Sequence, residues 1–219
     1  MPSVCVLPGL IWPSAEAAEA LRGIALPGFA TLLGHASLQQ SPAISLESWL
    51  AEQFGLSSKP PFAALRLAGE NNFLGDTPPA LDASENWLCA DPVALQFSRQ
   101  HLLLSDPATL DIQNDEALSI ISALNETFAD VGHFYAASMT RWYLRTSADI
   151  DVHFHALAQV IGRSVAHFQP EGRKQAFWAQ VGNELQVFCH NHPVNTAREA
   201  AGKPPLNAIW LWGAGRLPV

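Results

Sequence analysis

The stretch Ala208-Ile209-Trp210-Leu211-Trp212 decides the fold, because all of its side chains are apolar. A strand with one face in water alternates apolar and polar residues, whereas a strand covered on both faces is apolar throughout. The stretch therefore predicts a covered strand. It indicates an α/β fold, in which a mixed sheet is flanked by helices.

Three segments upstream predict further strands of this sheet. Residues 87–90 and 101–104 are short and apolar, bounded by polar residues. Residues 141–145 alternate, with Trp142 and Leu144 on one face and Arg141, Tyr143 and Arg145 on the other. This pattern predicts a half-buried strand whose polar face carries two arginines.

Two amphipathic helices are expected between these strands. In each, apolar residues recur three or four positions apart and form one stripe that can face a sheet. The first spans residues 115–129 and the second residues 174–188. Their stripes are Leu118, Ile121, Leu124 and Phe128 in the first helix, and Phe177, Val181, Leu185 and Phe188 in the second.

The amino-acid composition and the pattern of apolar residues change near residue 86. Residues 1–86 are rich in Ala, Leu, Pro and Gly and predict a strand at residues 3–7 followed by short helices. The clearest of these helices begins at Ser45, and residues 69–85 are the best candidate for a linker. We therefore expect a helix-rich N-terminal region over residues 1–86 and an α/β domain over residues 87–219.

Charge and composition narrow the classes of partner. The net charge of −8 and the pI near 5.4 provide no basic surface for nucleic acid. No run approaches the ~20 apolar residues that a membrane span requires. The cysteines, 3 in number, are far apart, which argues against a disulfide framework and favours a reducing compartment. The expected protein is cytoplasmic, with neither nucleic acid nor membrane as a partner.

The densest cluster of polar residues is His190-Asn191-His192-Pro193-Val194-Asn195-Thr196-Ala197-Arg198. Asn195 is expected to cap a short helix that carries Arg198. The free N–H groups of a helix start, together with a guanidinium, suit a phosphate or carboxylate. The structural alternative is that Asn195 only caps, Arg198 pairs with a carboxylate such as Glu199, and the histidines bond local carbonyls.

Metal and cofactor signatures are weak. Cys189, His190 and His192 do not have the spacing of a structural zinc site, and no second cluster completes four ligands. Gly213-Ala214-Gly215 has no helix after it, so it does not fit a dinucleotide fingerprint. We expect neither a metal nor a cofactor.

The polar cluster and the segment after it resemble one known family. Archaeal-type cofactor-independent phosphoglycerate mutases, of the alkaline phosphatase superfamily, carry His-Pro-x-Asn-x-x-Arg, then Gly and Pro, then Asn and an apolar strand that ends in Gly-x-Gly. The corresponding residues here are His192, Pro193, Asn195, Arg198, Gly202, Pro205, Asn207 and Ile209 through Gly215. The resemblance is to the insert region of these enzymes and covers about 130 residues, 87–218.

A resemblance over the whole chain is to stand-alone proteobacterial proteins, some described as regulatory proteins of the RpfE type and others as phosphoglycerate mutase-like. These share Arg-Trp-Tyr-Leu-Arg at 141–145, Pro-Glu-Gly at 170–172, His-Asn-His-Pro-Val-Asn at 190–195 and Trp-x-Trp-Gly-x-Gly-x-Leu-Pro at 210–218. This resemblance implies a bacterial regulatory or mutase-like protein.

The chain departs from the mutases where their chemistry resides. The resemblance implies a first-strand Asp-Gly that binds metal, a serine nucleophile and a downstream Asp/His set for two metals. Here residues 4–10 read Val-Cys-Val-Leu-Pro-Gly-Leu, without an aspartate. The chain also stops about where the mutases return to their catalytic domain. We therefore expect mutase activity to be absent.

Three functions follow from these observations. The first is non-catalytic or regulatory binding of a phosphorylated or carboxylated metabolite. The residues expected to line its site are Arg141, Arg145, His190, His192, Asn195, Arg198, Asn207, Trp210 and Trp212. The second is a protein–protein interaction module that uses the Trp-rich end. The third is a metal-dependent phosphotransferase with a rearranged site at Asp91, His190 and His192.

Overall fold

The computed structural model describes residues 22–37, 39, 44–56, 60–75, 79–80, 82–98 and 101–217. The chain forms two compact units, Met1–Ser58 and Lys59–Val219. The strand expected at residues 3–7 lies outside the described residues. Among the helices of the described part, none has the length and apolarity needed to cross a bilayer.

The described part of the first unit contains two helices, α2 (Pro27–Gly34) and α3 (Leu46–Gln53). The side-chain oxygen of Ser45 accepts a hydrogen bond of 3.1 Å from the backbone N–H of Ser48. This contact satisfies one of the free N–H groups at the start of α3. The helix expected to begin at Ser45 is confirmed.

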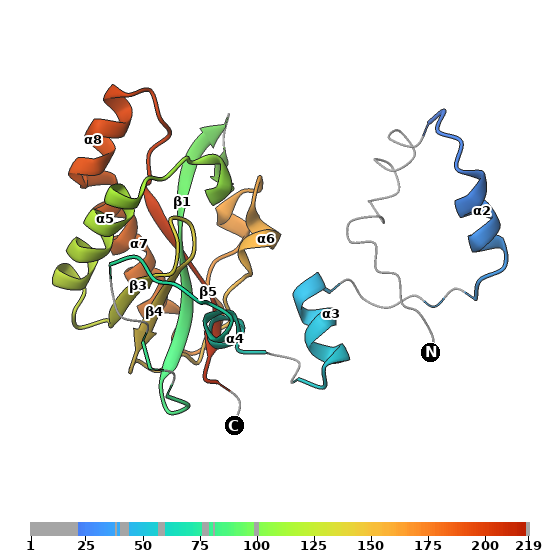
Figure 1. The fold of residues 1–219 in the computed structure, drawn as a ribbon, viewed down its shortest axis with the longest axis horizontal. Coiled ribbons are helices and arrows are strands. Elements are labelled where there is room, and N and C mark those ends of the chain that lie inside the picture. Colours follow the sequence, from blue (N-terminus) through green and yellow to red (C-terminus); the bar gives the residue numbers. More distant parts are fainter. Residues whose placement is uncertain are drawn as a thin grey trace. The chain divides into compact units, whose positions relative to one another are not determined.

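The second unit is built on one antiparallel sheet of five strands in the described residues (Figure 1). Its long central strand pairs with three of the other four strands, and the remaining strand pairs with β4. The strands are β1 (Asn86–Ser98), β2 (His101–Ser105), β3 (His133–Ala136), β4 (Trp142–Thr146) and β5 (Ala208–Gly215). The α/β class is confirmed, and the strands at 87–90, 101–104, 141–145 and 208–212 are all present; β3 was not anticipated.

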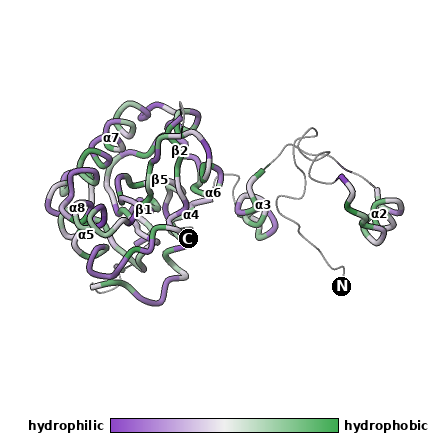
Figure 2. The backbone as a smooth tube through the Cα atoms, turned by 90° about the horizontal axis from the view of Figure 1, so that it is seen from above, coloured by the Kyte–Doolittle hydropathy of each residue, from purple (hydrophilic) through white to green (hydrophobic). Residues whose placement is uncertain are grey.

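Helices lie on both sides of this sheet (Figures 1 and 2). One face carries α5 (Asn114–Thr127), α7 (Gln175–Asn191) and α8 (Pro193–Ala200). The opposite face carries α4 (Phe62–Ala68), which packs against β1 and β5. The short helix α6 (Leu157–Val160) and the 3-10 turn η2 (Val165–His167) pack over β2 and the second half of β1, and a second turn, η1 (Pro107–Thr109), follows β2.

The alternation of side chains along β1 builds two separate cores. Leu88 and Ala90 face α5 and α7, while Trp87 and Cys89 face α4; all of them are fully buried. Burial of one large apolar side chain contributes about 1.5–3 kcal/mol. Because both faces of β1 are filled, α4 belongs to the core of the second unit, although the sequence pattern placed it in the N-terminal region.

Two expected faces are corrected by this packing. Tyr143 was expected on a polar face of β4, yet it is 0% exposed because α4 covers that face. In α7, Phe177 was expected to face inward and is 43% exposed. Its neighbour Trp178 is buried instead, because it packs beside Phe154 and donates its indole N–H to the carbonyl of Asp149.

Candidate functional site

The polar cluster after α7 is a tight junction between two helices. His192 ends α7 and caps α8, where its Nδ1 accepts a hydrogen bond of 3.3 Å from the N–H of Val194. Pro193 occupies the first turn of α8, a position where the missing N–H is harmless. The expectation that Asn195 is the cap is therefore wrong, because the helix has already begun two residues earlier.

Asn195 is buried and ties this junction to the segment that leads into β5. Its Nδ2 donates to the carbonyls of Cys189 (2.6 Å) and Leu206 (2.9 Å). Its Oδ1 accepts from the N–H of Leu206 at 2.7 Å. Both polar atoms of the amide are thus used within the chain, which gives Asn195 a structural role.

Arg198 lies in the interior, with its side chain 0% exposed. Its Nε donates to the carbonyl of Pro204 at 2.8 Å, its Nη1 to Glu116 at 2.6 Å and its Nη2 to the carbonyl of Leu110. These contacts fasten α8 to α5. A guanidinium enclosed in this way does not face an external anion.

The remaining residues of the resemblance also bond inward. Asn207 pairs with the backbone of Leu95 through its Oδ1 (2.7 Å) and its Nδ2 (3.0 Å), as a strand neighbour would. The indole N–H of Trp210 donates to the carbonyl of His155, and that of Trp212 donates to Asp91. The Trp-rich end is therefore bonded into the unit.

The Gly-x-Gly of β5 makes room for α4. A Cβ at Gly213 would lie 3.0 Å from the Cβ of Phe62, and one at Gly215 would lie 2.5 Å from the Cβ of Pro61. Gly213 also has a φ of +66°, which favours glycine. These glycines thus allow the start of α4 to approach β5 closely.

A buried polar network links α4 to the sheet on this side. Asp91 is 1% exposed and accepts two hydrogen bonds from the guanidinium of Arg66, at 2.7 and 2.9 Å. Asp91 also accepts from the N–H of Trp142 and from the indole of Trp212. The Nε of Arg66 donates to the hydroxyl of Tyr143 at 2.9 Å. The carboxylate of Asp91 is fully occupied by protein donors.

The network continues to the surface through Glu70. Tyr143 donates to Glu70 at 2.6 Å, and Arg141 makes a bidentate pair with the same carboxylate at 2.7 and 3.0 Å. Burial raises the pKa of Tyr143, so its hydroxyl stays protonated as a donor. Burial would raise the pKa of Glu70, but bonds from Arg141 and Tyr143 outweigh it and lower that pKa. Arg141 is thus paired with a charged partner.

The residues of the expected metal alternative are separated by the sheet. Asp91 faces α4, whereas His192 packs against Phe188 on the opposite face, and His190 is exposed. Within the described part of the chain, no group of three or more His, Cys, Asp or Glu side chains is placed to hold a metal ion.

A polar hollow at one end of the sheet brings two arginines together. We call it the arginine hollow; its volume is about 590 Å³. In the sheet, Trp87 of β1 lies opposite both Arg145 of β4 and Gly215 of β5, so Arg145 and Arg216 flank the start of β1. The lining residues are Ser84, Glu85, Asn86, Asn125, Ala129, Gly132, His133, Arg145, Thr146, Ser147 and Arg216.

The donors of these two arginines are largely free. Arg145 lies 3.7 Å from Glu85, with both side chains about one-third exposed, and its guanidinium lies over the ring of Tyr135. Ion pairs of this kind are weak. Arg216 donates from Nε to Asn86 at 3.0 Å, and its terminal nitrogens have no partner among the described residues. Such a pair of forks suits an anion with several oxygens.

Gly132 shapes one wall of the arginine hollow. A Cβ at this position would lie 2.1 Å from the carbonyl oxygen of Arg145. The backbone that carries Arg145 therefore packs directly onto residue 132. This contact fixes the base of the Arg145 side chain.

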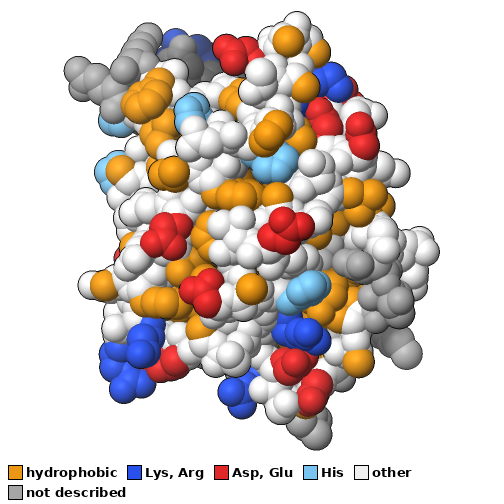
Figure 3. Space-filling model, turned by 90° about the vertical axis from the view of Figure 1, so that its left-hand side faces the viewer, with side chains coloured by type: hydrophobic (Ala, Val, Ile, Leu, Met, Phe, Trp, Pro, Cys, Tyr) orange, Lys and Arg blue, Asp and Glu red, His pale blue; other side chains and the backbone are white. Residues whose placement is uncertain are grey.

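Arg145 was expected at a binding site from the sequence, whereas Arg216 and His133 were not. Arg216 comes directly after the Gly-x-Gly that ends β5, and β5 runs antiparallel to β1. The strand order alone would have indicated its position beside Asn86. The structure does not bring Arg141, Arg145 and Arg198 to one site, because Arg198 lies among the helices of one face while Arg141 joins Glu70 on the α4 side. On the face drawn in Figure 3, hydrophobic side chains are interspersed with acidic, basic and histidine side chains.

Comparison with known proteins identifies relatives over part of the chain. The 2,3-bisphosphoglycerate-independent phosphoglycerate mutase of Methanosarcina mazei is 27% identical over 137 residues, 60% of this chain and 34% of the enzyme. Mutase 2 of Methanothermobacter thermautotrophicus is 31% identical over 136 residues, 61% of this chain and 31% of the enzyme. The chain is similar to phosphoglycerate mutases. This agrees with the resemblance to their insert region.

The similarity to these enzymes covers only part of their length. The chain spans about one-third of the length of these curated relatives. A solved structure of the cofactor-independent phosphoglycerate mutase from Thermoplasma acidophilum aligns with 82% of this chain and 49% of its own, with a TM-score of 0.47 and 16% identity. No family model matches the chain.

Proposed function

We propose that this protein is a non-catalytic binder of a phosphorylated or carboxylated metabolite, and that the ligand occupies the arginine hollow. The observation that carries the proposal is that Arg145 and Arg216 both line one polar hollow, and that each has guanidinium N–H groups without a close partner among the described residues. Two forks on either side of a strand can each bind two oxygens of one anion.

The surroundings of the two arginines favour an anion over a neutral ligand. Ser147 lines the same hollow and carries a neutral donor, whereas the side chain of Ser84 is hydrogen-bonded to Asp82. Glu85 is the opposing charge, but its separation of 3.7 Å from Arg145 and its exposure make it easy to displace. Since the chain as a whole carries a net charge of −8, this is a local site for an anion on an acidic protein.

We propose a non-catalytic role because the carboxylate that could serve in catalysis already has hydrogen-bond partners within the protein. Asp91 is saturated by Arg66, Trp142 and Trp212. Activation of a nucleophile in two-metal phosphoryl transfer requires carboxylates and imidazoles that are free to bind metal. The relatives are named for action on phosphoglycerate, which makes 3-phosphoglycerate the first ligand to test.

Thermal unfolding and calorimetry with 3-phosphoglycerate and inorganic phosphate test the proposal at 0.15 M salt. We expect either anion to raise the Tm, and Arg145→Met and Arg216→Met each to weaken binding at least tenfold. Arg173→Met is the matched control: it removes the same charge from a side chain that is 84% exposed and outside the hollow. Binding should survive this change.

Two results would contradict the proposal. The first is an unchanged Tm with both anions, or an equal loss in the Arg173→Met control, which would indicate charge attraction without a site. The second is conversion of 3-phosphoglycerate to 2-phosphoglycerate by the purified chain. That result would preserve binding and refute the non-catalytic role.

A further inference from the structure

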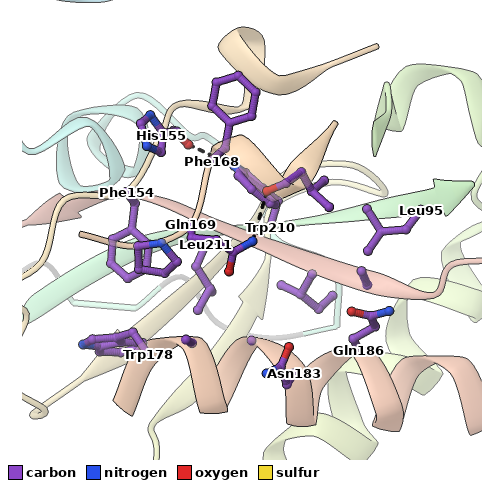
Figure 4. Close-up of a pocket in the computed structure, with 16 residues that line it drawn as sticks. Leu95, Phe154, His155, Phe168, Gln169, Trp178, Asn183, Gln186, Trp210 and Leu211 are labelled. Atoms are coloured by element: carbon purple, nitrogen blue, oxygen red, sulfur yellow. Dashed lines mark hydrogen bonds between the residues drawn. The ribbon is translucent and has the colours of Figure 1, made fainter. Parts of the chain in front are cut away.

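A second pocket lies between α7 and β5, and it shares no lining residue with the arginine hollow. Its cavity volume is about 100 Å³. Figure 4 shows Trp178, Asn183 and Gln186 projecting from α7 on one side, with Phe154 and Phe168 on the other and Trp210 beside them. Aromatic rings thus form much of its wall.

The wall formed by α7 is hollowed by a glycine. Gly182 lies in the interior of α7, where glycine is about 1 kcal/mol less favourable than alanine. A Cβ at this position would meet no atom within 4 Å, so the fold itself gives no steric reason for glycine. The missing side chain widens the pocket between Trp178 and Gln186, one turn away on either side.

The polar groups of the pocket are neutral amides with free positions. Asn183 and Gln186 have no hydrogen-bond partner among the described residues, and Gln169 uses its Nε2 on the carbonyl of Val165. None of the lining residues in this part of the chain is Asp, Glu, Lys or Arg. A carboxylate or phosphate would therefore find no balancing charge among the lining residues, although the guanidinium of Arg163 lies over the ring of Phe168 at 4.5 Å.

His155 is the titratable group of this lining. Burial lowers the pKa of its imidazole, with a smaller contribution from His153, so the ring is neutral near pH 7. Its Nε2 is buried without a hydrogen-bond partner in the described residues, and the nearest carboxylate oxygen, from Glu171, is 4.0 Å away. The ring packs edge-on against His153 and Phe168, so the contribution of His155 to the lining is neutral.

We propose that this pocket binds a neutral heteroaromatic molecule with a single six-membered ring and an amide-like edge, such as uracil, cytosine or nicotinamide. An apolar cavity of roughly 150 Å³ holds benzene, so a cavity of about 100 Å³ that opens to solvent beside the exposed Asn183 admits at most one ring, with one edge left in water. The aromatic walls offer stacked or edge-to-face contact with the ring. The side-chain amides supply both the donors and the acceptors that such an edge requires.

The test is titration of the full-length chain with uracil, cytosine and nicotinamide, followed by tryptophan fluorescence and by chemical-shift changes of amide groups. We expect at least one compound to bind with a Kd below 1 mM and to shift signals of α7 and β5. Gly182→Leu fills the space and should weaken binding at least tenfold, while the Tm is unchanged or higher because leucine favours helix.

Two control variants show whether binding depends on this pocket. Ala176→Leu adds the same side chain to an exposed position of α7 outside the pocket and should leave binding unchanged. Arg145→Met should also leave it unchanged, since the arginine hollow is a different site. Should Gly182→Leu fail to fold, Asn183→Leu tests the same wall from a position that is exposed.

The proposal is overturned if none of the three compounds binds below 1 mM, or if both wall variants bind like the parent chain. It is also overturned if a nucleotide with a phosphate binds in this pocket more tightly than its base. Such a result would mean that the pocket accepts charge, against the neutrality of its lining.

Discussion

Replacement of Asp91 by asparagine should destabilise the second unit by about 3 kcal/mol. The change keeps the shape of the side chain but removes the charge that balances Arg66. Breaking a buried ion pair on one side costs about 3–5 kcal/mol, because the other charge is left uncompensated. Arg66 is 22% exposed and Asp91 1%. Water can reach part of the stranded guanidinium, which places the effect at the lower end of that range.

Urea unfolding followed by tryptophan fluorescence measures this effect, because Trp212 bonds directly to Asp91. The double variant Arg66→Met/Asp91→Asn removes both charges and should be less destabilised than the sum of the single variants, by at least 1 kcal/mol. Additivity within about 0.5 kcal/mol would show that the two groups do not interact. That outcome, or a cost below about 1 kcal/mol for Asp91→Asn alone, would refute the reasoning.

Three further outcomes follow from the same packing. Arg198→Met should cost about 3–5 kcal/mol in urea unfolding, because it leaves Glu116 and two carbonyls without their partner. The control Lys203→Met removes a charge from a side chain that is 32% exposed and should cost less than about 1 kcal/mol. Similar costs for the two variants would contradict the structural role of Arg198. Gly132→Ala should lower the Tm, because the added Cβ would clash with the carbonyl oxygen of Arg145. Gly182→Ala should raise the Tm, because it places alanine in an open position of a helix. An unchanged Tm for Gly132→Ala would mean that the backbone moves to relieve the clash. Burial lowers the pKa of His192 below its ordinary value of 6.5. The unfolded chain therefore binds a proton at this histidine more readily than the folded chain does. As a result, the free energy of unfolding decreases as the pH falls from 6.5 toward the lowered pKa. His192→Asn keeps a capping side chain and should show a smaller loss of Tm between pH 7 and pH 5; an identical pH profile would exclude His192 as the cause.

Local patterns predicted most of the elements but not which faces are covered. The periodicity of residues 115–129 and 174–188 is a property of each helix alone, so α5 and α7 were expected within a few residues of their bounds. The burial of Tyr143 depends on α4, and Arg66 of that helix, which bonds to Tyr143, is 77 positions earlier in the chain. No local pattern carries that information. The strand β3 (His133–Ala136) was missed as well.

The residues of the candidate site were harder to predict for a related reason. The sequence presented a dense group of polar residues, and density alone does not say whether their donors point outward. Asn195, Arg198 and Asn207 all bond to the chain's own backbone. Pro193 was a usable signal for the helix start, since proline favours the first helical position and makes the preceding His192 the cap. Arg216 becomes visible only when β5 is placed beside β1.

The pairing of β1 with β5 also sets the order of events on the ribosome. Asn207 holds Leu95 across 112 positions of the chain, and at about 5–20 residues per second this interval takes roughly 6–22 seconds to synthesise. During that time the edge of β1 that later pairs with β5 has no neighbouring strand. The backbone N–H and C=O groups of this apolar segment are therefore unpaired. We expect nascent-chain chaperones to contact this segment. Slowed translation between the two strands should therefore lower the soluble yield more than slowed translation after β5.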